Sequence, residues 1–192
     1  DRIAFRIVER GTDDHCIDQG FKRMALEAGA TIHYNTKANP KDCTIIAAGP
    51  KDTSAIAFGE VYKTSFPNHV SFQLNDKLAP GAYSYLIVID GIGLICTCLW
   101  RKQKNSNRYL NETIACYEKL YPELDREPIK RVGGKGDFSI PSTYFANEQY
   151  FVGEAGGLQD FMWGFGMRYA VTSGVMAANC LLNGTNYDAQ IR

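Results

Sequence analysis

The alternation of apolar and polar positions predicts a strand and a helix near the start of the chain. Residues 3–8, IAFRIV, form an apolar run that is expected to be a strand. Apolar residues then recur at helical spacing over residues 17–28, with Asp13 or Asp14 as the expected N-cap and Gly29 as the C-terminal stop. The stripe therefore predicts an amphipathic helix.

Two more strands are predicted directly after this helix. Residues 30–35, ATIHYN, are predicted to form a strand, and residues 43–50, CTIIAAGP, follow the Asn39-Pro40 turn as a continuous apolar run that ends in glycine. A continuous apolar run is typical of a strand that is buried on both faces. The order strand, helix, strand, strand indicates an α/β layer.

The middle of the chain changes to a pattern typical of antiparallel strands. Residues 69–74 alternate between polar and apolar, and two β-rich runs cover residues 82–89 and 92–100. The pair Asp90-Gly91 lies between these runs, which is a strong signal for a two-residue hairpin. A β-rich sheet is therefore predicted from about residue 59.

A second helix is predicted after the hairpin, with Ser106 as its cap and Pro122 as its stop. Its apolar stripe consists of Leu110, Ile114, Tyr117 and Tyr121. Residues 131–141, RVGGKGDFSIP, are interpreted as a glycine-rich return toward the last part of the chain, with no element assigned to them.

The last part of the chain, FVGEAGGLQDFMWGFGMRYAVTSG at residues 151–174, predicts a buried strand, a turn and a helix. Gly156 and Gly157 remove side chains either where the chain must turn or where a ligand lies against it. A helix that begins near Gly166 would point free N–H groups and a positive dipole end at a partial negative charge. The segment is thus either a tight structural turn or a ligand site.

Composition and charge exclude several classes of protein. The 192 residues include 21 basic and 21 acidic ones, and a net charge of zero argues against binding nucleic acid by phosphate neutralisation. No run of about 18 apolar residues predicts a membrane-spanning helix. The six cysteines include no CxxC pair and the histidines have no ligand spacing, so no metal site is predicted. The cysteines are interpreted as small buried residues in a reducing, cytoplasmic compartment.

The last segment resembles the final flavin-contacting motif of FAD-dependent oxidoreductases of the geranylgeranyl-reductase and aromatic-hydroxylase type. In that family a strand ends in Gly-Asp-Ala-Ala/Gly, and a Pro- or Gly-rich loop then starts a long helix. The matching residues are Gly153, Glu154, Ala155 and Gly156, followed by Gly164, Phe165, Gly166 and Met167. Residues 10–32 and 43–55 are similar to two earlier family segments, in family order.

The resemblance implies an α/β (α+β) fold in which an antiparallel β-sheet substrate domain is inserted into part of a Rossmann-like FAD domain. Residues 1–58 and 141–192 would form the FAD-binding part, and residues 59–140 the substrate domain. Besides the last motif, the implied FAD contacts are Arg10, Ala48 and Gly49. The family acid contacts the ribityl hydroxyls, a role that falls to Glu154, and the helix start faces the pyrimidine end of the flavin.

Two departures from the family bear on cofactor binding. The chain has no GxGxxG loop for the FAD pyrophosphate, and it begins without Met, so it is interpreted as a C-terminal fragment that lacks the dinucleotide-binding motif and is inactive alone. The family Asp is replaced by Glu154, which is one methylene longer, so the ribityl contact is shifted or lost.

The function implied by the resemblance is reduction of a small hydrophobic, isoprenoid-like substrate by a flavoprotein. Tyr83, Tyr85, Trp100 and Trp163 are the expected substrate contacts, although alternating aromatic residues also pack cores. No catalytic acid or base is identified. A flavin hydroxylase, and a non-redox small-molecule-binding domain that has lost FAD, remain open. An isoprenoid substrate would also imply peripheral membrane association, which no basic amphipathic helix supports.

Overall fold

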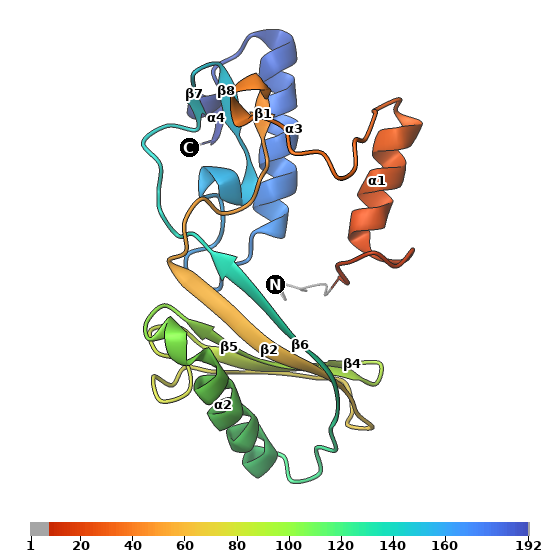
Figure 1. Cartoon of the computed structure of the whole chain (residues 1–192), viewed down its shortest axis with the longest axis vertical. Coiled ribbons are helices and arrows are strands. Elements are labelled where there is room, and N and C mark those ends of the chain that lie inside the picture. Colours follow the sequence, from red (N-terminus) through yellow and green to blue (C-terminus); the bar gives the residue numbers. More distant parts are fainter. Residues whose placement is uncertain (1–7, 192) are drawn as a thin grey trace, which may run out of the picture. The chain divides into compact units, whose positions relative to one another are not determined.

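A computed structural model describes residues 8–191 of the chain (Figure 1). The chain divides into two compact units between Asp42 and Cys43. The strand expected at residues 3–8 lies, except for Val8, outside the described residues. None of the described helices has the length and the hydropathy that crossing a membrane requires.

The first unit contains the predicted helix, α1 (Ile17–Glu27), and the short turn η1 (Pro40–Asp42). The C-terminal stop is confirmed, because Gly29 has a φ of 86° and its N–H donates to the Leu26 carbonyl at 2.9 Å. The expected Asp cap is wrong. Cys16 is the N-cap residue and makes no side-chain cap bond, while the Asp13 carbonyl accepts the Cys16 N–H in the preceding turn.

The strands expected after this helix are only partly present. Residues 30–35 form no strand. Residues 43–50 contribute only β1 (Ile45–Ile46), and Ile45 is 37% exposed, so burial of this strand on both faces is also wrong. Among the described residues β1 pairs only with β8, so it is a short edge strand of the small sheet.

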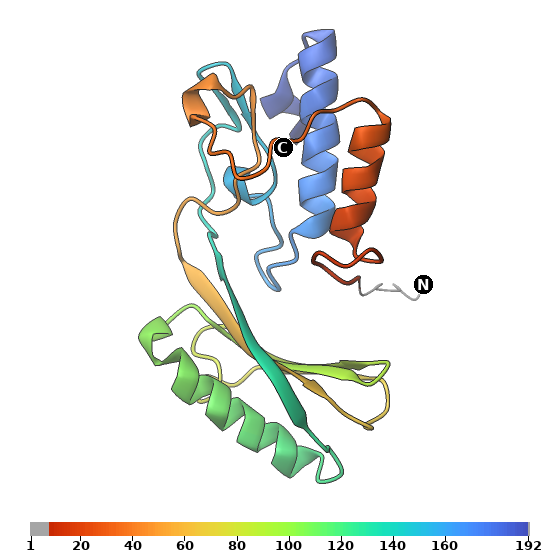
Figure 2. The same cartoon turned by 45° about the vertical axis from the view of Figure 1, so that its right-hand side comes forward.

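The second unit contains a small sheet against which the last long helix lies (Figure 2). Its strands are β1, β7 (Phe145–Ala146) and β8 (Gln149–Phe151), in the order β1-β8-β7. The turn η3 (Gly153–Gly156) leads to α3 (Met167–Asn183) and α4 (Tyr187–Ile191). The strand, turn and helix predicted for the last segment are confirmed, and Gly184 ends α3 with a φ of 63°.

The second unit also contains a five-stranded antiparallel sheet in the order β3-β4-β5-β2-β6. Its strands are β2 (Ala55–Lys63), β3 (His69–Gln73), β4 (Ser84–Ile89), β5 (Ile92–Leu99) and β6 (Glu127–Gly136). The Asp90-Gly91 hairpin is confirmed: both residues have positive φ, 48° and 81°, as a two-residue turn of this type requires. Mixed helices and strands around an antiparallel sheet agree with the expected α/β (α+β) class.

The glycine-rich residues 131–136 belong to β6, a strand that the sequence did not predict. This edge strand pairs with β2, and Gly133 faces the Phe58 ring of that strand. A Cβ on Gly133 would approach the ring to 3.2 Å, so the glycine lets the ring lie over the backbone.

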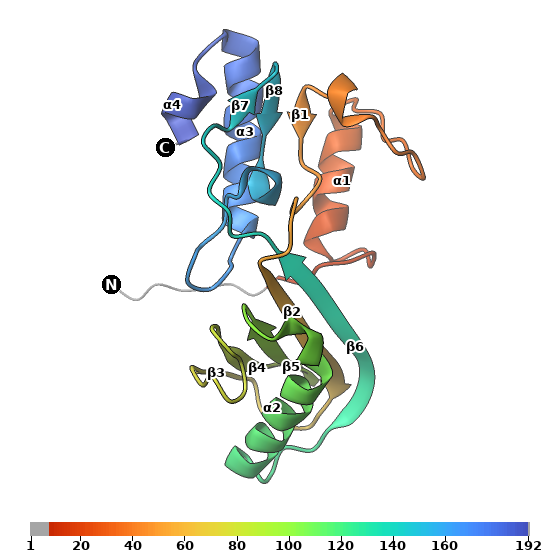
Figure 3. The same cartoon turned by 60° about the vertical axis from the view of Figure 1, so that its left-hand side comes forward.

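One face of the five-stranded sheet is covered by α2 (Ser106–Leu120), which follows the turn η2 (Gln103–Asn105) (Figure 3). Asn105, not Ser106, is the N-cap residue of α2. The core between sheet and helix contains Tyr62, Leu86, Ile95, Leu110 and Tyr117, all fully or almost fully buried. Because side chains alternate along strands, Phe72, Tyr85 and Cys98 lie on the opposite face of the sheet.

Gly93 is expected to be essential for this core. A Cβ at position 93 would overlap the ring of Tyr62, which is fully buried and has no space to move. Gly93→Ala should therefore lower the free energy of unfolding by about 1–3 kcal/mol, the usual effect of overpacking. Urea unfolding measures the change. Gly134→Ala is the matched control, since a Cβ there meets nothing within 4 Å; equal destabilisation by both variants would contradict the prediction.

Candidate functional site

The carboxyl ends of β1 and β8 lie at the same edge of the small sheet. The two strands run parallel, with Ile45 opposite Tyr150 and Ile46 opposite Phe151. Ala48 and Gly49 follow β1, and Gly153 and Glu154 follow β8. The fold thus brings together two predicted site segments that are about a hundred residues apart, at the kind of edge where α/β proteins bind ligands.

Three glycines of the last segment are required by packing within the protein. Gly153 has a φ of 54°, and a Cβ there would lie 3.1 Å from the Ala170 Cβ. A Cβ on Gly156 would lie 2.7 Å from the Phe151 carbonyl oxygen. Gly157 has a φ of 67°, and a Cβ there would overlap a backbone carbonyl. Of the two interpretations left open by the sequence, the tight turn accounts for these residues.

The start of α3 lies directly after Gly164 and Gly166. Gly166 is its N-cap residue and makes no side-chain cap bond, and its carbonyl accepts the Ala170 N–H at 2.8 Å. A Cβ on Gly166 would meet nothing closer than 3.8 Å, so this side of the loop is open. The first N–H groups of α3 therefore present a partial positive charge. Ser173, further along α3, joins the helix to η3 by accepting the Gly153 N–H at 2.9 Å.

Glu154 is a half-buried acid at the end of β8. Its Oε1 accepts the Asp137 N–H at 3.3 Å. Loss of hydration raises the pKa of the Glu154 carboxyl, and the nearby negative charge of Asp137 raises it further. The Asp137 N–H and the nearby Lys135 charge lower the pKa of this carboxyl again in part, so Glu154 is an acid whose charge is only partly solvated.

Asp137 is a buried acid of the site that the sequence did not reveal. It is 4% exposed, and its carboxylate accepts the N–H groups of Ser139 at 3.0 Å and Asp52 at 3.1 Å. Hydrogen bonds with Ser139 contribute most to holding its pKa below the usual range. Gln159 donates to the Asp137 carbonyl at 2.6 Å. Asp137 therefore fixes the junction between β6 and the loop that precedes β7.

Three of the four expected substrate contacts lie close to Phe72. The ring of Tyr83 lies 5.1 Å from Trp163 and 6.1 Å from Tyr85, and Phe72 lies 5.4 Å from Trp163, between ring centroids. The Tyr83 hydroxyl donates to the Trp163 carbonyl. The cluster therefore joins the face of the sheet opposite α2 to the loop that starts α3.

Trp100 does not belong to this aromatic cluster. Its ring lies 5.1 Å from Phe138, which in turn lies 6.4 Å from Phe161. Phe138 has no signal in the sequence, because it follows a strand that the glycine-rich composition conceals.

Two cysteines lie beside the aromatic cluster. Cys96 and Cys98 share one face of β5, and the interaction between their thiols raises the pKa of the Cys98 thiol and lowers the pKa of the Cys96 thiol. Burial raises the pKa of Tyr83 and Tyr85 well above the usual value. All six cysteines are free thiols.

The loop between η3 and α3 is held by Asp160. Its carboxylate accepts the N–H of Met162 at 3.0 Å and of Trp163 at 2.6 Å, and its carbonyl accepts the Gly164 N–H at 2.8 Å. The apolar side chains of Phe161, Met162 and Phe165 are each 46–64% exposed on this loop. The loop is therefore an ordered turn that displays apolar groups.

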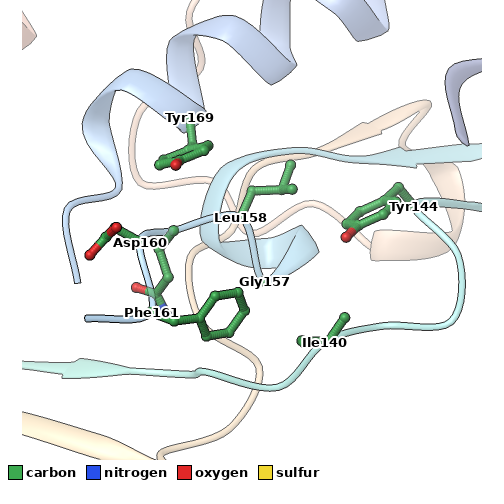
Figure 4. Close-up of a pocket in the computed structure, with 8 residues that line it drawn as sticks. Ile140, Tyr144, Gly157, Leu158, Asp160, Phe161 and Tyr169 are labelled. Carbon is green, nitrogen blue, oxygen red and sulfur yellow. The ribbon is translucent and has the colours of Figure 1, made fainter. Parts of the chain in front are cut away.

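A pocket of about 200 Å³ lies beside this loop (Figure 4). It is lined by Ile140, Tyr144, Gly157, Leu158, Gln159, Asp160, Phe161 and Tyr169. Pockets that hold drug-sized ligands measure about 300–1,000 Å³, so this one is too small for a flavin or a prenyl chain.

Arg10, the remaining implied cofactor contact, lies in the first unit. Its guanidinium makes two bonds of 2.7 Å with the Asp18 carboxylate and holds the pKa of that carboxyl at about 2. The arginine thus fixes the loop before α1.

No protein-family model matches the chain, and no curated protein matches it. Solved structures share its fold. A geranylgeranyl bacteriochlorophyll reductase-like protein from Thermoplasma acidophilum has 19% identity and a TM-score of 0.54, over 72% of this chain and 37% of its own. The flavin-dependent halogenase CmlS has 14% identity and a TM-score of 0.62, over 90% of this chain and 41% of its own. The resemblance to FAD-dependent oxidoreductases is thus confirmed for the fold, and the chain spans about two fifths of these structures.

Proposed function

We propose that the chain is part of an FAD-dependent oxidoreductase and supplies the protein groups around the ribityl chain and pyrimidine end of the flavin. The observation that carries this proposal is the parallel β1–β8 pair, which brings Ala48-Gly49 and Gly153-Glu154 to one edge. The fold shared with a flavin-dependent halogenase supports it. Ala155, Gly156, Gly164, Phe165, Gly166 and Met167 complete the proposed contacts, with Arg10 from the first unit.

The residues of the site fit a flavin. Gly49 has a φ of 78° and nothing within 4 Å of its Cβ position, so a ligand can lie against the backbone. The poorly solvated Glu154 carboxylate offers acceptor oxygens to ribityl hydroxyls, and the uncapped start of α3 at Met167 offers N–H groups. Asp137 would hold Glu154 in position through its N–H.

The bound flavin would supply hydride transfer, and these residues would orient it and tune its charge. The dipole end of α3 would stabilise negative charge at the pyrimidine end, because fixed N–H dipoles need no reorganisation when charge develops. The apolar loop side chains Phe161, Met162 and Phe165 would exclude water from the ring.

The proposed substrate is a small hydrophobic, isoprenoid-like molecule that the protein reduces. Support comes from the aromatic cluster of Tyr83, Tyr85 and Trp163, which offers apolar surface next to the proposed flavin loop. Trp100 would contact the substrate from the separate group with Phe138. A flavin-dependent oxygenation, as in a hydroxylase, is the second candidate and would use the same proposed flavin contacts.

The proposed domain organisation follows the sequence prediction. Residues 1–58 and 141–192 would build the flavin-binding domain and residues 59–140 the substrate domain. Apolar residues on the long helices are open to solvent, including Phe21 and Met24 of α1 and Val175 of α3 at 45–64% exposure. We propose that further parts of a longer protein cover these surfaces.

A visible absorption spectrum tests the proposal. The spectrum is recorded for this chain and for the whole product of its gene, each with and without added FAD and after removal of free flavin. We expect flavin bands in the gene product and weak or no bands in the chain alone. Absence of flavin bands from both, after incubation with FAD, would contradict the proposal and leave the non-redox binding domain.

A further inference from the structure

The loop before α1 brings three possible metal ligands together. The side chains of Glu9, His15 and Cys16 place one oxygen, one nitrogen and one sulfur atom within 4.8 Å of one another. Glu9 and His15 are exposed and form an ion pair, while Cys16 is 4% exposed. The sequence argued against a metal site because the cysteines form no CxxC pair; the third donor comes from a carboxylate seven residues before the cysteine.

The loop is held in place by other groups. The Ile17 N–H donates to the Glu9 carbonyl at 3.1 Å, which closes the loop around its two ends. Asp18 accepts the Gly11 N–H at 3.0 Å and pairs with Arg10. These bonds involve no side-chain atom of Glu9, His15 or Cys16. The three side chains can therefore turn toward a metal ion without breaking the bonds that hold the loop.

The donor set selects the kind of metal. A thiolate, an imidazole and a carboxylate together suit Zn²⁺, whereas Mg²⁺ and Ca²⁺ prefer sites made only of oxygen atoms. A tetrahedral zinc ion separates such ligand atoms by about 3.5 Å. Small rotations of the exposed Glu9 and His15 side chains would bring the three atoms to this spacing. Water would take the fourth position on the exposed side.

We propose that Glu9, His15 and Cys16 form a zinc site with three protein ligands and one open position. Binding would tie the Glu9 side chain to the start of α1 across the loop. None of the three ligands is a proposed flavin contact, and Zn²⁺ binding is measured without flavin, so the zinc site is tested separately from the proposed function.

Titration of the chelator-treated, reduced full chain with Zn²⁺ and with Co²⁺ tests the site. We expect one equivalent to bind in the micromolar range, and the Co²⁺ form to show a thiolate-to-cobalt charge-transfer band. Cys16→Ser should abolish this band, while Cys43→Ser should retain it. His15→Ala should weaken Zn²⁺ binding at least tenfold. Even the loss of a residue that only hydrogen-bonds to a metal ligand lowers metal affinity by about 10–100-fold. His33→Ala, at an exposed histidine, should leave the affinity unchanged.

Circular dichroism checks that each variant is folded, and Glu9→Gln provides a conservative variant that keeps the size and an acceptor oxygen at this position. Glu9→Gln should also lower the Zn²⁺ affinity at least tenfold. The proposal is overturned if the unaltered chain binds no Zn²⁺ in the micromolar range. It is equally overturned if the charge-transfer band persists in Cys16→Ser, or if folded Glu9→Gln and His15→Ala bind Zn²⁺ as the unaltered chain does.

Discussion

Gly157→Ala is expected to lower the free energy of unfolding by about 3 kcal/mol. Gly157 has a φ of 67°, a conformation that costs other residues about 1–2 kcal/mol. A Cβ there would also overlap the Ser139 carbonyl oxygen and lie 3.2 Å from the Pro141 Cδ. Since a backbone carbonyl cannot turn aside like a side chain, the loop itself would have to move.

Urea unfolding of the unaltered chain and of Gly157→Ala measures this loss, and Gly174→Ala is the matched control. Gly174 lies within α3, where a Cβ meets nothing within 4 Å. Alanine there should stabilise the helix by about 0.5–1 kcal/mol. Opposite signs for the two variants would establish that Gly157 serves the turn. A loss below about 1 kcal/mol for Gly157→Ala would mean that the turn tolerates a side chain and that the packing explanation is wrong.

Turns and helix ends that depend only on neighbouring residues could be predicted from the sequence. The Asp90-Gly91 hairpin forms because its two residues accept positive φ, and α1 and α3 end where Gly29 and Gly184 adopt the left-handed conformation. These features depend on the backbone of two or three neighbouring residues. The local sequence pattern is therefore sufficient to predict the hairpin and the two helix ends.

Elements that depend on distant partners could not be predicted in the same way. The run at residues 30–35 has a strand-like pattern and forms no strand, because an apolar run needs a paired neighbour to become one. Conversely, β6 contains Gly133 and Gly134 and still forms a strand, because β2 pairs with it and Phe58 packs over its backbone. Pairing decides both cases, because residues 30–35 have no partner strand among the described residues whereas β6 pairs with β2.

The residues of the candidate site also fall into those that a local sequence pattern indicates and those that only distant contacts reveal. Gly153 and Glu154 could be found because they lie in one short segment with a family resemblance. Asp137 could not be found in this way, because its place in the site depends on two contacts with residues far away in the sequence. Its carboxylate accepts the Asp52 N–H, and its own N–H donates to the Glu154 carboxylate. The two acids come together only in the folded chain, where the segment that follows β6 contacts the segment that follows β8.

Glu154→Gln is expected to make the chain more stable near neutral pH and to weaken FAD binding by the whole gene product. Burial raises the pKa of the Glu154 carboxyl above its ordinary value of 4.5. An acid whose folded pKa is raised favours folding when protonated, and this contribution is lost as the pH rises through the folded pKa. Glutamine is neutral at every pH and avoids that loss. The stability difference should therefore appear above the folded pKa and vanish below about pH 4.

The same substitution should lower the affinity for FAD by about tenfold or more, because hydrogen bonds to a charged acceptor contribute about 1.5–3 kcal/mol. Urea midpoints across pH measure the first effect, and flavin fluorescence titration of the gene product measures the second. Glu123→Gln, at an exposed glutamate, should change neither. If Glu154→Gln gains stability and binds FAD more weakly, Glu154 is a flavin-binding acid whose partial burial lowers the stability of the fold. Unchanged flavin affinity would remove Glu154 from the site, and unchanged stability at neutral pH would refute the burial of its charge.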